Sequence, residues 1–179
     1  KMLPPFKKIN GAKVNLLPLT LKDVTCEYVS WLNDPDVVRF SNQRFKTHSL
    51  SSCEEYVKSY GRSSSKLLKI LRKDDDLFVG TMTVNFSPEH DRADIGILLG
   101  RRSVWGMGLG RDAWNTLLDW LLNVACVRKV TGGAMRCNTP MIRIMERSGM
   151  TIDAIRSDHE LLNGMPQDLV YFSKFREPI

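Results

Sequence analysis

The sequence predicts an α/β fold of the α+β kind, with a mixed, mostly antiparallel central sheet of about seven strands and four helices on its faces. Short apolar runs bounded by turn residues indicate the strands, and apolar stripes at helical spacing indicate the helices. Their order is strand, two helices, three strands, helix, strand, helix and two strands, and layer rules place such helices on the faces of one sheet. No repeat, low-complexity segment or linker interrupts residues 1–179, so a single domain is expected.

The front of the chain is expected to form a strand and then a helix. The strand covers Lys13–Leu19, and Thr20 with Asp23 then gives a capping signature for a helix that runs to about Leu32. Asn33-Asp34-Pro35 ends this helix, because the residue before a proline is disfavoured in helical conformation.

A second capping box, Ser51 with Glu54, predicts a helix that ends near Gly61. The later strands are expected from runs of apolar and β-branched residues between turn signals. These runs are Lys66–Arg72, Leu77–Phe86, Ala93–Gly100, Lys129–Met135, residues 151–162 and residues 168–175, the last two being separated by residues 163–167.

The run Ala93–Gly100 is apolar at nearly every position except Asp94, which predicts a central strand covered on both faces. An i, i+4 apolar stripe predicts the third helix from about Leu109 to Ala125. The fourth helix is expected to open at Asn138-Thr139-Pro140, with Thr139 as its cap and Pro140 in the first turn, and to end at Gly149.

Composition excludes several classes of protein. No apolar run is long enough to span a membrane, and the four cysteines form no CxxC pair, so we expect no membrane association, no metal and a reduced, cytoplasmic chain. The net charge of +6 favours polyanionic partners, yet the basic residues form no block and are not interleaved with aromatic residues. We therefore expect no nucleic-acid partner, and a phosphate-rich small molecule suits the charge equally well.

The stretch VWGMGLGRDAW, residues 104–114, is a glycine-rich turn before the third helix. It lacks the lysine of a nucleoside-triphosphate loop. Gly108–Ala113 fits a dinucleotide fingerprint, but Arg101–Trp105 separates it from the strand, and the strand that follows carries no acidic residue. A coenzyme A pyrophosphate turn would use backbone N–H groups at a helix N-terminus, with Arg101, Arg102 and Arg111 adding charge. A purely structural connection is the alternative.

The rest of the chain resembles the GNAT superfamily of N-acetyltransferases, in the branch that is similar to the ribosomal-protein acetyltransferases RimJ and RimL. The resemblance covers LLPLTLKDVTCEYVSWLNDPDVVRF at the front, ADIGILLG with WGMGLGRDAW in the middle, and RKVTGGAMRCNTPMIRIMERSGM near the end. This chain departs from the family pattern at Trp105, where glutamine or arginine is general although the RimJ/RimL-like branch often has tryptophan, and at Met107 and Met150, where lysine and phenylalanine are common.

The resemblance implies a central strand that splays at its C-terminal half and an acetyl-CoA co-substrate that pairs with the strand. A backbone N–H of Leu98 or Leu99 would polarise the thioester carbonyl, and one such donor is typically worth about 2.7–4 kcal/mol in the transition state. Asn138 would hold the pantetheine arm, or else serve as a helix cap. The residues expected to contact the coenzyme are Ile97, Leu98, Leu99, Arg102, Trp105, Gly106, Met107, Gly108, Leu109, Gly110, Arg111 and Asn138.

Acetyl transfer to an amine also needs a group that takes the proton of the ammonium form. Asp94 is the first candidate, because burial would raise its pKa, and an ion pair with Arg92 or Arg101 is the alternative. Glu160 is the second candidate, ahead of His159. A proton donor is harder to find, because the family's tyrosine position is Met145 and the serine position of some members is Met141. A water molecule, the hydroxyl of Tyr171 or unassisted departure of the thiolate would replace it.

The acceptor pocket is expected from the loop Asn33–Arg44, the second helix and the last hairpin. Phe40, Gln43, Arg44 and Phe45 offer one cation, an amide and flat apolar faces, and Asn33 is expected to contact the acceptor with them. This mixture suits an anionic small-molecule amine such as a nucleotide-linked amino sugar better than a protein N-terminus. The expected activity is direct acetyl transfer in a ternary complex by a monomer or homodimer. A protein N-terminal acetyltransferase and a non-catalytic acyl-CoA-binding domain are the alternatives.

Overall fold

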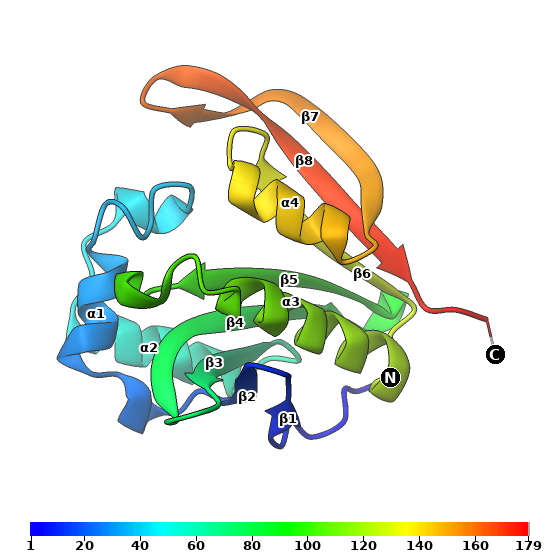
Figure 1. Cartoon of the computed structure of the whole chain (residues 1–179), viewed down its shortest axis with the longest axis horizontal. Helices are drawn as coiled ribbons and strands as arrows, with labels where there is room; N and C mark the ends of the chain where they lie inside the picture. Colours follow the sequence, from blue (N-terminus) through cyan, green and yellow to red (C-terminus); the bar gives the residue numbers. More distant parts are fainter. Residues whose placement is uncertain (179) are drawn as a thin grey trace.

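The computed structural model describes residues 1–178 and contains one eight-stranded mixed sheet with the order β1-β2-β3-β4-β5-β6-β8-β7 (Figure 1). β5 and β6 are parallel, and every other neighbouring pair is antiparallel. The strands are β1 (Ile9–Asn10), β2 (Val14–Pro18), β3 (Lys66–Arg72), β4 (Leu77–Ser87), β5 (Arg92–Leu99), β6 (Lys129–Met135), β7 (Thr151–Leu162) and β8 (Met165–Phe175). The predicted fold class is confirmed, and the short β1 adds a strand to the seven expected.

Four α-helices cover the two faces of this sheet: α1 (Cys26–Leu32), α2 (Leu50–Tyr60), α3 (Leu109–Asp119) and α4 (Thr139–Arg147). A larger apolar core joins α3 and α4 to one face, with Trp114 and Met145 fully buried. A smaller core joins α1 and α2 to the opposite face, where Leu67 and Leu98 point. Because side chains alternate along a strand, Ile97 and Leu99 of β5 face the larger core and Leu98 faces the smaller one.

The helix starts differ from the predicted ones. Thr20 and Asp23 do form a reciprocal capping box, but it closes a short 3-10 turn, Leu21–Asp23, and α1 begins later, capped by the hydroxyl of Thr25. The cap of α2 is Ser49 with Ser52, two residues earlier than the predicted pair of Ser51 and Glu54. Ser49, Ser51 and Ser52 can each cap a helix, so the sequence motif alone does not determine the residue at which α2 begins.

Two further predictions need correction. The cap of α4 is Asn138, whose side-chain oxygen accepts a hydrogen bond from Met141 N at 3.4 Å, and Thr139 is the first helical residue. The last hairpin turns through Asn163 and Gly164 alone, both with positive φ, so β8 begins at Met165 instead of residue 168. An Asn-Gly pair favours such a two-residue turn, because its twist matches that of the flanking strands.

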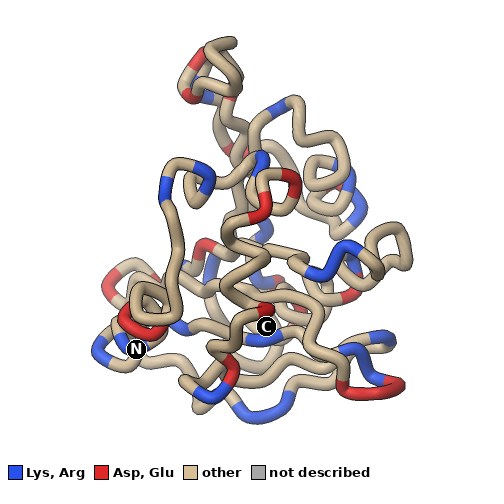
Figure 2. The backbone as a smooth tube through the Cα atoms, turned by 90° about the vertical axis from the view of Figure 1, so that its left-hand side faces the viewer, with Lys and Arg blue, Asp and Glu red and all other residues tan. Residues whose placement is uncertain are grey.

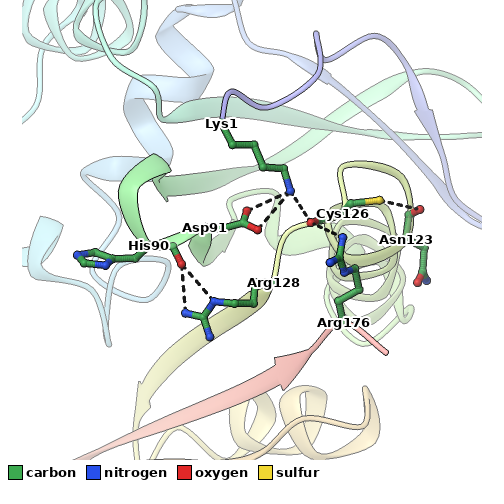
Figure 3. A network of polar contacts seen from close by, with 7 residues as sticks. All are labelled: Lys1, His90, Asp91, Asn123, Cys126, Arg128 and Arg176. Carbon is green, nitrogen blue, oxygen red and sulfur yellow. Dashed lines mark hydrogen bonds and ion pairs between the residues drawn. The ribbon is translucent and has the colours of Figure 1, made fainter. Parts of the chain in front are cut away.

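The end of the sheet where β5 and β6 begin is tied together by polar contacts (Figure 3). Lys1 Nζ lies 3.1 Å from Asp91 Oδ1 and also donates to the carbonyl of Cys126. The same carbonyl accepts a hydrogen bond from Arg176 at 3.1 Å, and Arg128 donates to the carbonyl of His90 at 3.1 Å. These bonds join the segments before β5, before β6 and after β8, and we call this region the closed end of the sheet.

Charge is spread widely over the chain. Figure 2 shows lysine and arginine along the whole tube, interspersed with aspartate and glutamate. Several arginines are partly engaged, as in the pair of Arg101 with Glu27 that joins the end of β5 to α1. None of the helices within residues 1–178 is long and apolar enough to cross a membrane.

Candidate active site

The C-terminal half of β5 has an open backbone edge. β5 pairs with β4 along Arg92–Leu99, but within the described residues it pairs with β6 only along Arg92–Asp94. Gly100 N donates to Val79 O at 3.0 Å, and the direction of N–H groups alternates along a strand. The N–H and C=O groups of Ile97 and Leu99 therefore point away from β4, into the gap beside β6. The splay expected from the family resemblance is present at this point of the sheet.

The burial of side chains along β5 changes at this gap. Ala93 and Ile95 are buried, whereas the residues from Gly96 to Leu99 are partly exposed. The prediction of a strand covered on both faces is therefore wrong for its second half, because the sequence is apolar there without a neighbouring strand to cover it. An apolar strand end that remains partly exposed is a surface that a ligand can cover.

The glycine-rich turn is fastened to this open edge by Trp105. Its indole Nε1 donates to Leu99 O at 2.8 Å, and 42% of the residue remains exposed. Arg102 lies over the indole ring at 5.7 Å, so the predicted coenzyme contacts Leu99, Arg102 and Trp105 lie together. The hydrogen bond fixes the distance between the turn and the strand edge, and the indole face stays available to a ligand.

The turn leads into the N-terminus of α3 through two glycines with left-handed backbone. Gly106 has φ +81° and Gly108, the N-terminal cap, has φ +78°. A Cβ added at Gly106 would meet nothing within 4 Å, so the space above the turn is open. The first-turn N–H groups, which include those of Gly110 and Arg111, have no acceptor in the preceding turn of the helix, and the helix dipole favours an anion there. A phosphate group fits this cradle.

The remaining residues predicted to contact the coenzyme differ in which of their atoms a ligand can reach. Met107 is 52% exposed, and its carbonyl accepts a hydrogen bond from Lys13 Nζ at 3.2 Å. Leu109 is buried in the larger core, so only its backbone is available to a ligand. Asn138 lies after the end of β6, where its Oδ1 caps α4, and its amide nitrogen has no partner among the described residues. The capping alternative for Asn138 is therefore present, and it leaves an amide donor beside the gap.

A cavity of about 410 Å³ opens on the opposite face of β5, beside Gly96, Ile97 and Leu98. Its walls come from α1, α2, β3, β4 and the segment between α1 and α2. Gln43 lines it as predicted, whereas His48, Ser52, Tyr56, Thr81 and Thr83 were not predicted. Because β5 separates this cavity from the glycine-rich turn, two ligands can approach the same strand from opposite faces.

Asp94 and Glu160, the predicted proton acceptors, do not line this cavity. Asp94 sits at the last position where β5 pairs with β6, and its Oδ2 accepts a hydrogen bond from the Thr131 hydroxyl at 2.7 Å. Burial raises the pKa of Asp94, while the Thr131 hydrogen bond and nearby Arg92 oppose the rise. The predicted rise of its pKa through burial is confirmed, whereas an ion pair with Arg92 or Arg101 is not found within the described residues: Asp94 is half-buried beside the Thr131 hydroxyl. Glu160 lies on β7, opposite Gln167.

A second cavity, of about 820 Å³, lies between the α1–α2 segment and the tip of the β7–β8 hairpin. The predicted acceptor residues Asn33 and Arg44 line it, but Phe40 lines neither cavity. Arg44 donates to Ser41 O and to Leu161 O, both at 2.8 Å, and so bridges the segment to the hairpin. Leu32, Lys46 and Thr47 line both cavities, so the two spaces are adjacent.

Arg39, Arg44 and Lys46 line the second cavity, and no aspartate or glutamate of residues 1–178 does. Arg44 also lies 4.1 Å over the ring of Phe45, which is 70% exposed. The sequence pointed to this loop as a whole, but it could not show that its cations converge with the distant hairpin. A cavity with three cations and an exposed aromatic ring suits an anionic, ring-containing ligand.

No proton donor is found at the positions where the family carries one, and Tyr171, the hydroxyl considered in their place, lies on the last strand pair. Met145 is fully buried and Met141 packs against the larger core, so neither position offers a donor. Tyr171 lies on β8 beneath the guanidinium of Arg156, 5.4 Å from its ring centroid. All four cysteines are free, and Cys137 is exposed next to Asn138.

Comparison with known proteins agrees with this geometry. A family model described as an acetyltransferase (GNAT) domain matches residues 13–151. A comparison with curated protein sequences gave no match. An acetyltransferase of the GNAT family from Bacillus anthracis has a similar fold, with a TM-score of 0.82, 15% sequence identity, and coverage of 96% of this chain and 100% of that chain.

Two further solved structures are similar. A RimL ribosomal-protein alpha-N-acetyltransferase in complex with coenzyme A has a TM-score of 0.82 at 16% identity, with 94% of this chain and 98% of that chain covered. The microcin self-immunity acetyltransferase MccE, in complex with acetyl-CoA and AMP, has a TM-score of 0.77 at 20% identity, with 93% and 94% covered. RimL among these neighbours agrees with the resemblance seen in the sequence. Since the family model spans most of the sequence, the chain belongs to the GNAT family of acetyltransferases.

Proposed function

We propose that this chain transfers the acetyl group of acetyl-CoA to the primary amine of an anionic small molecule, with a nucleotide-linked amino sugar as the best-matched class. Acetyl-CoA supplies the thioester. The glycine-rich turn from Trp105 to Arg111 holds its phosphates through backbone N–H groups, and Asn138 contributes its amide from across the gap. The open cradle at Gly106 and the unpaired edge of β5 support this role.

The backbone of β5 orients the reaction. The N–H of Leu99 points into the gap, so it is the donor that would stabilise the oxyanion, in preference to Leu98, whose N–H direction is toward β4. The amine arrives from the opposite face, through the cavity beside Gly96–Leu98. Both substrates then meet at one strand, which supports direct transfer in a ternary complex.

The cationic second cavity determines the specificity for the acceptor amine. Its three cations, Arg39, Arg44 and Lys46, would bind phosphate groups, and the exposed ring of Phe45 offers a stacking face for a base. The cavity is adjacent to the one beside β5 and shares Leu32, Lys46 and Thr47 with it, which supports a single elongated acceptor that spans both. The AMP bound by MccE, a protein of similar fold, supports a nucleotide in the acceptor. The basic walls are less suited to the N-terminus of a protein, whose ammonium group favours a more acidic groove.

The test is release of free thiol from acetyl-CoA with a panel of nucleotide-linked amino sugars, free amino sugars, polyamines and peptides with free N-termini. We expect the nucleotide-linked amines to have the highest kcat/KM. A preference for peptides would instead identify a protein N-terminal acetyltransferase. Binding of acetyl-CoA without thiol release with any amine would identify an acyl-CoA-binding domain, and either result overturns the proposal.

A matched pair of variants tests the cationic cavity. Arg39→Gln removes one lining cation, and we expect it to raise the KM of the anionic acceptor about fivefold, close to 1 kcal/mol, with kcat nearly unchanged. Arg62→Gln removes an exposed arginine that does not line either cavity and should leave KM unchanged. Equal effects of the two substitutions would show that net charge, and not the cavity, attracts the acceptor.

A further inference from the structure

The cavity beside Gly96–Leu98 contains one imidazole, that of His48, among the described residues that line it. The other titratable groups on its walls are Lys46, from the segment before α2, Tyr28 of α1, and Cys53 and Tyr56 of α2. No carboxylate of residues 1–178 lines it. The proton that must leave an ammonium substrate therefore has few acceptors within the cavity itself.

The other groups are poor proton acceptors. Burial raises the pKa of Tyr28 and of Tyr56, whose hydroxyl also shares a hydrogen bond of 2.9 Å with Tyr60. Burial likewise raises the pKa of the Cys53 thiol. These three groups stay protonated at neutral pH, and the Lys46 ammonium has no lone pair with which to accept a proton. Histidine is the side chain whose charge changes in the neutral range.

Two contacts fix how His48 is held. The Nε2 atom lies 3.3 Å from the carbonyl oxygen of Gln43. A carbonyl can only accept, so a hydrogen bond there requires the proton on Nε2 and leaves the lone pair on Nδ1. The backbone is held by Asn33, whose Oδ1 accepts from His48 N and whose Nδ2 donates to His48 O, both at 2.8 Å. Both polar side-chain atoms of Asn33 are used in these two hydrogen bonds. Asn33 was predicted to bind the acceptor substrate, whereas in the structure its side chain holds the backbone of His48.

We propose that His48 is the proton acceptor of the transfer reaction, with Asn33 as its positioning residue. The ammonium group of the acceptor gives a proton to Nδ1 of His48, directly or through one water molecule. The freed lone pair of the amine forms the N–C bond to the acetyl carbonyl carbon, and the C–S bond breaks with its electron pair left on sulfur. The nitrogen, now cationic, gives its second proton to that thiolate, so the products are the amide and the free thiol of coenzyme A. The imidazolium then returns its proton to solvent. This role rests on amine acetylation but not on which amine is used.

The test compares His48→Gln with His90→Gln, a control at an exposed histidine of the closed end. General-base catalysis typically contributes about 10²–10⁴-fold, so we expect kcat of His48→Gln to fall about 100-fold or more, with the KM of acetyl-CoA unchanged. The acidic limb of the kcat/KM profile against pH should disappear. Full turnover with an unchanged acidic limb overturns the role of His48 while thiol release still supports acetyl transfer.

Asn33 gives a second, independent readout. Asn33→Ala removes both contacts with the His48 backbone, and we expect a roughly tenfold loss of kcat without a change in the affinity for acetyl-CoA. In a His48→Gln background Asn33→Ala should cost little more, because its effect on kcat passes through His48. Full additivity of the two losses overturns the positioning role.

Two measurements guard against loss of folding. Exogenous imidazole should restore part of the activity of His48→Ala, which a merely structural role would not allow. The unaltered protein should also lose kcat/KM with a one-proton dependence as the pH falls, and a flat profile in that range overturns the proposal. Absence of thiol release by the unaltered protein with every amine is a separate result, which refutes the proposed function itself.

Discussion

At its start β5 is paired on both sides, with β4 and with β6, whereas at its end the pairing with β4 continues and the pairing with β6 stops. The starting end is further held by the contacts among Lys1, Asp91, Cys126, Arg128 and Arg176 (Figure 3). The other end is held to the glycine-rich turn through a side chain, Trp105. One strand thus combines a fully bonded half with a half whose backbone groups are available.

This difference explains how a sheet can keep a gap open. Unpaired backbone groups inside a protein are costly unless a partner or water satisfies them. The contacts of the closed end join the segments that lead into β5 and β6, so the two strands are held together where they begin. The N–H and C=O of Ile97 and the N–H of Leu99 are then left for a ligand, while the Leu99 carbonyl accepts from Trp105. The predictions below act on one end or the other.

The largest effect is expected from a matched pair of glycine substitutions. Gly106 in the open-end turn and Gly164 in the hairpin turn have φ of +81° and +77°, and a Cβ at either would meet nothing within 4 Å. Replacement by alanine therefore costs similar backbone strain, roughly 1 kcal/mol at each site. Only Gly106→Ala should also weaken binding of coenzyme A, about tenfold, since its methyl group would enter the space for the phosphates.

Thermal unfolding and titration calorimetry separate these two effects. Both variants should lose a few degrees of Tm to a similar extent, about 2–4 °C for 1 kcal/mol in a protein of this size. Equal affinity of both variants for coenzyme A would show that the turn from Trp105 to Arg111 does not hold the phosphates.

An intermediate effect, on stability, is expected from Asp94→Asn at the junction of the two ends. Because burial raises the pKa of Asp94 in the folded protein, its carboxyl adds stability below the unfolded-state pKa, and this contribution is lost as the pH rises through the folded-state pKa. The variant should therefore gain Tm relative to the unaltered protein at pH 8 but not at pH 3. An identical difference at both pH values would contradict a raised pKa of Asp94 in the folded protein.

The same variant distinguishes the two candidate bases. Asp94 does not line the acceptor cavity, so we expect turnover to change far less than in His48→Gln. A loss of turnover in Asp94→Asn as large as that in His48→Gln would identify Asp94 of β5 as the proton acceptor.

The smallest effect is expected from Arg102→Gln at the open end. Arg102 lies 2.9 Å from Asp36 and 3.4 Å from Asp34, with 55% of its side chain exposed, and exposed pairs of this kind contribute about 0–1 kcal/mol. Stability should hardly change, whereas affinity for coenzyme A should fall two- to threefold at low salt and converge with that of the unaltered protein at high salt. Arg62→Gln, whose residue lies after α2, is the control. An unchanged affinity at low salt would remove Arg102 from the coenzyme site.

The fold was predictable because its signals are local. The apolar stripe of α3 and the strand runs depend on spacing along the chain. The element bounds were less predictable: the helix caps, the short β1 and the start of β8 differ from the expected ones, and at α2 the cap is Ser49 with Ser52 in place of Ser51 with Glu54. The glycine-rich turn was also visible, because Gly106 and Gly108 are needed for their backbone conformation, which sequence reports directly.

The acceptor side was not predictable to the same degree, because it is assembled from distant segments. Arg44 reaches Leu161 across 117 positions of the chain, and no spacing rule connects them. His48 was overlooked because nothing in the adjacent sequence distinguishes it, and its surroundings come from α1, α2 and β4 together. Asp94 shows the converse: an isolated charge in an apolar strand drew attention, but strand geometry placed it outside the cavity.

The two hydrogen bonds between Asn33 and His48 also have a consequence for entropy. They join the ends of a segment of the chain that would otherwise sample many conformations, and each ordered residue of such a segment carries an entropic cost. With its ends already joined in the unliganded protein, this segment loses less freedom when an acceptor enters. More of the interaction energy of Arg39, Gln43 and Arg44 then remains for discrimination between acceptors.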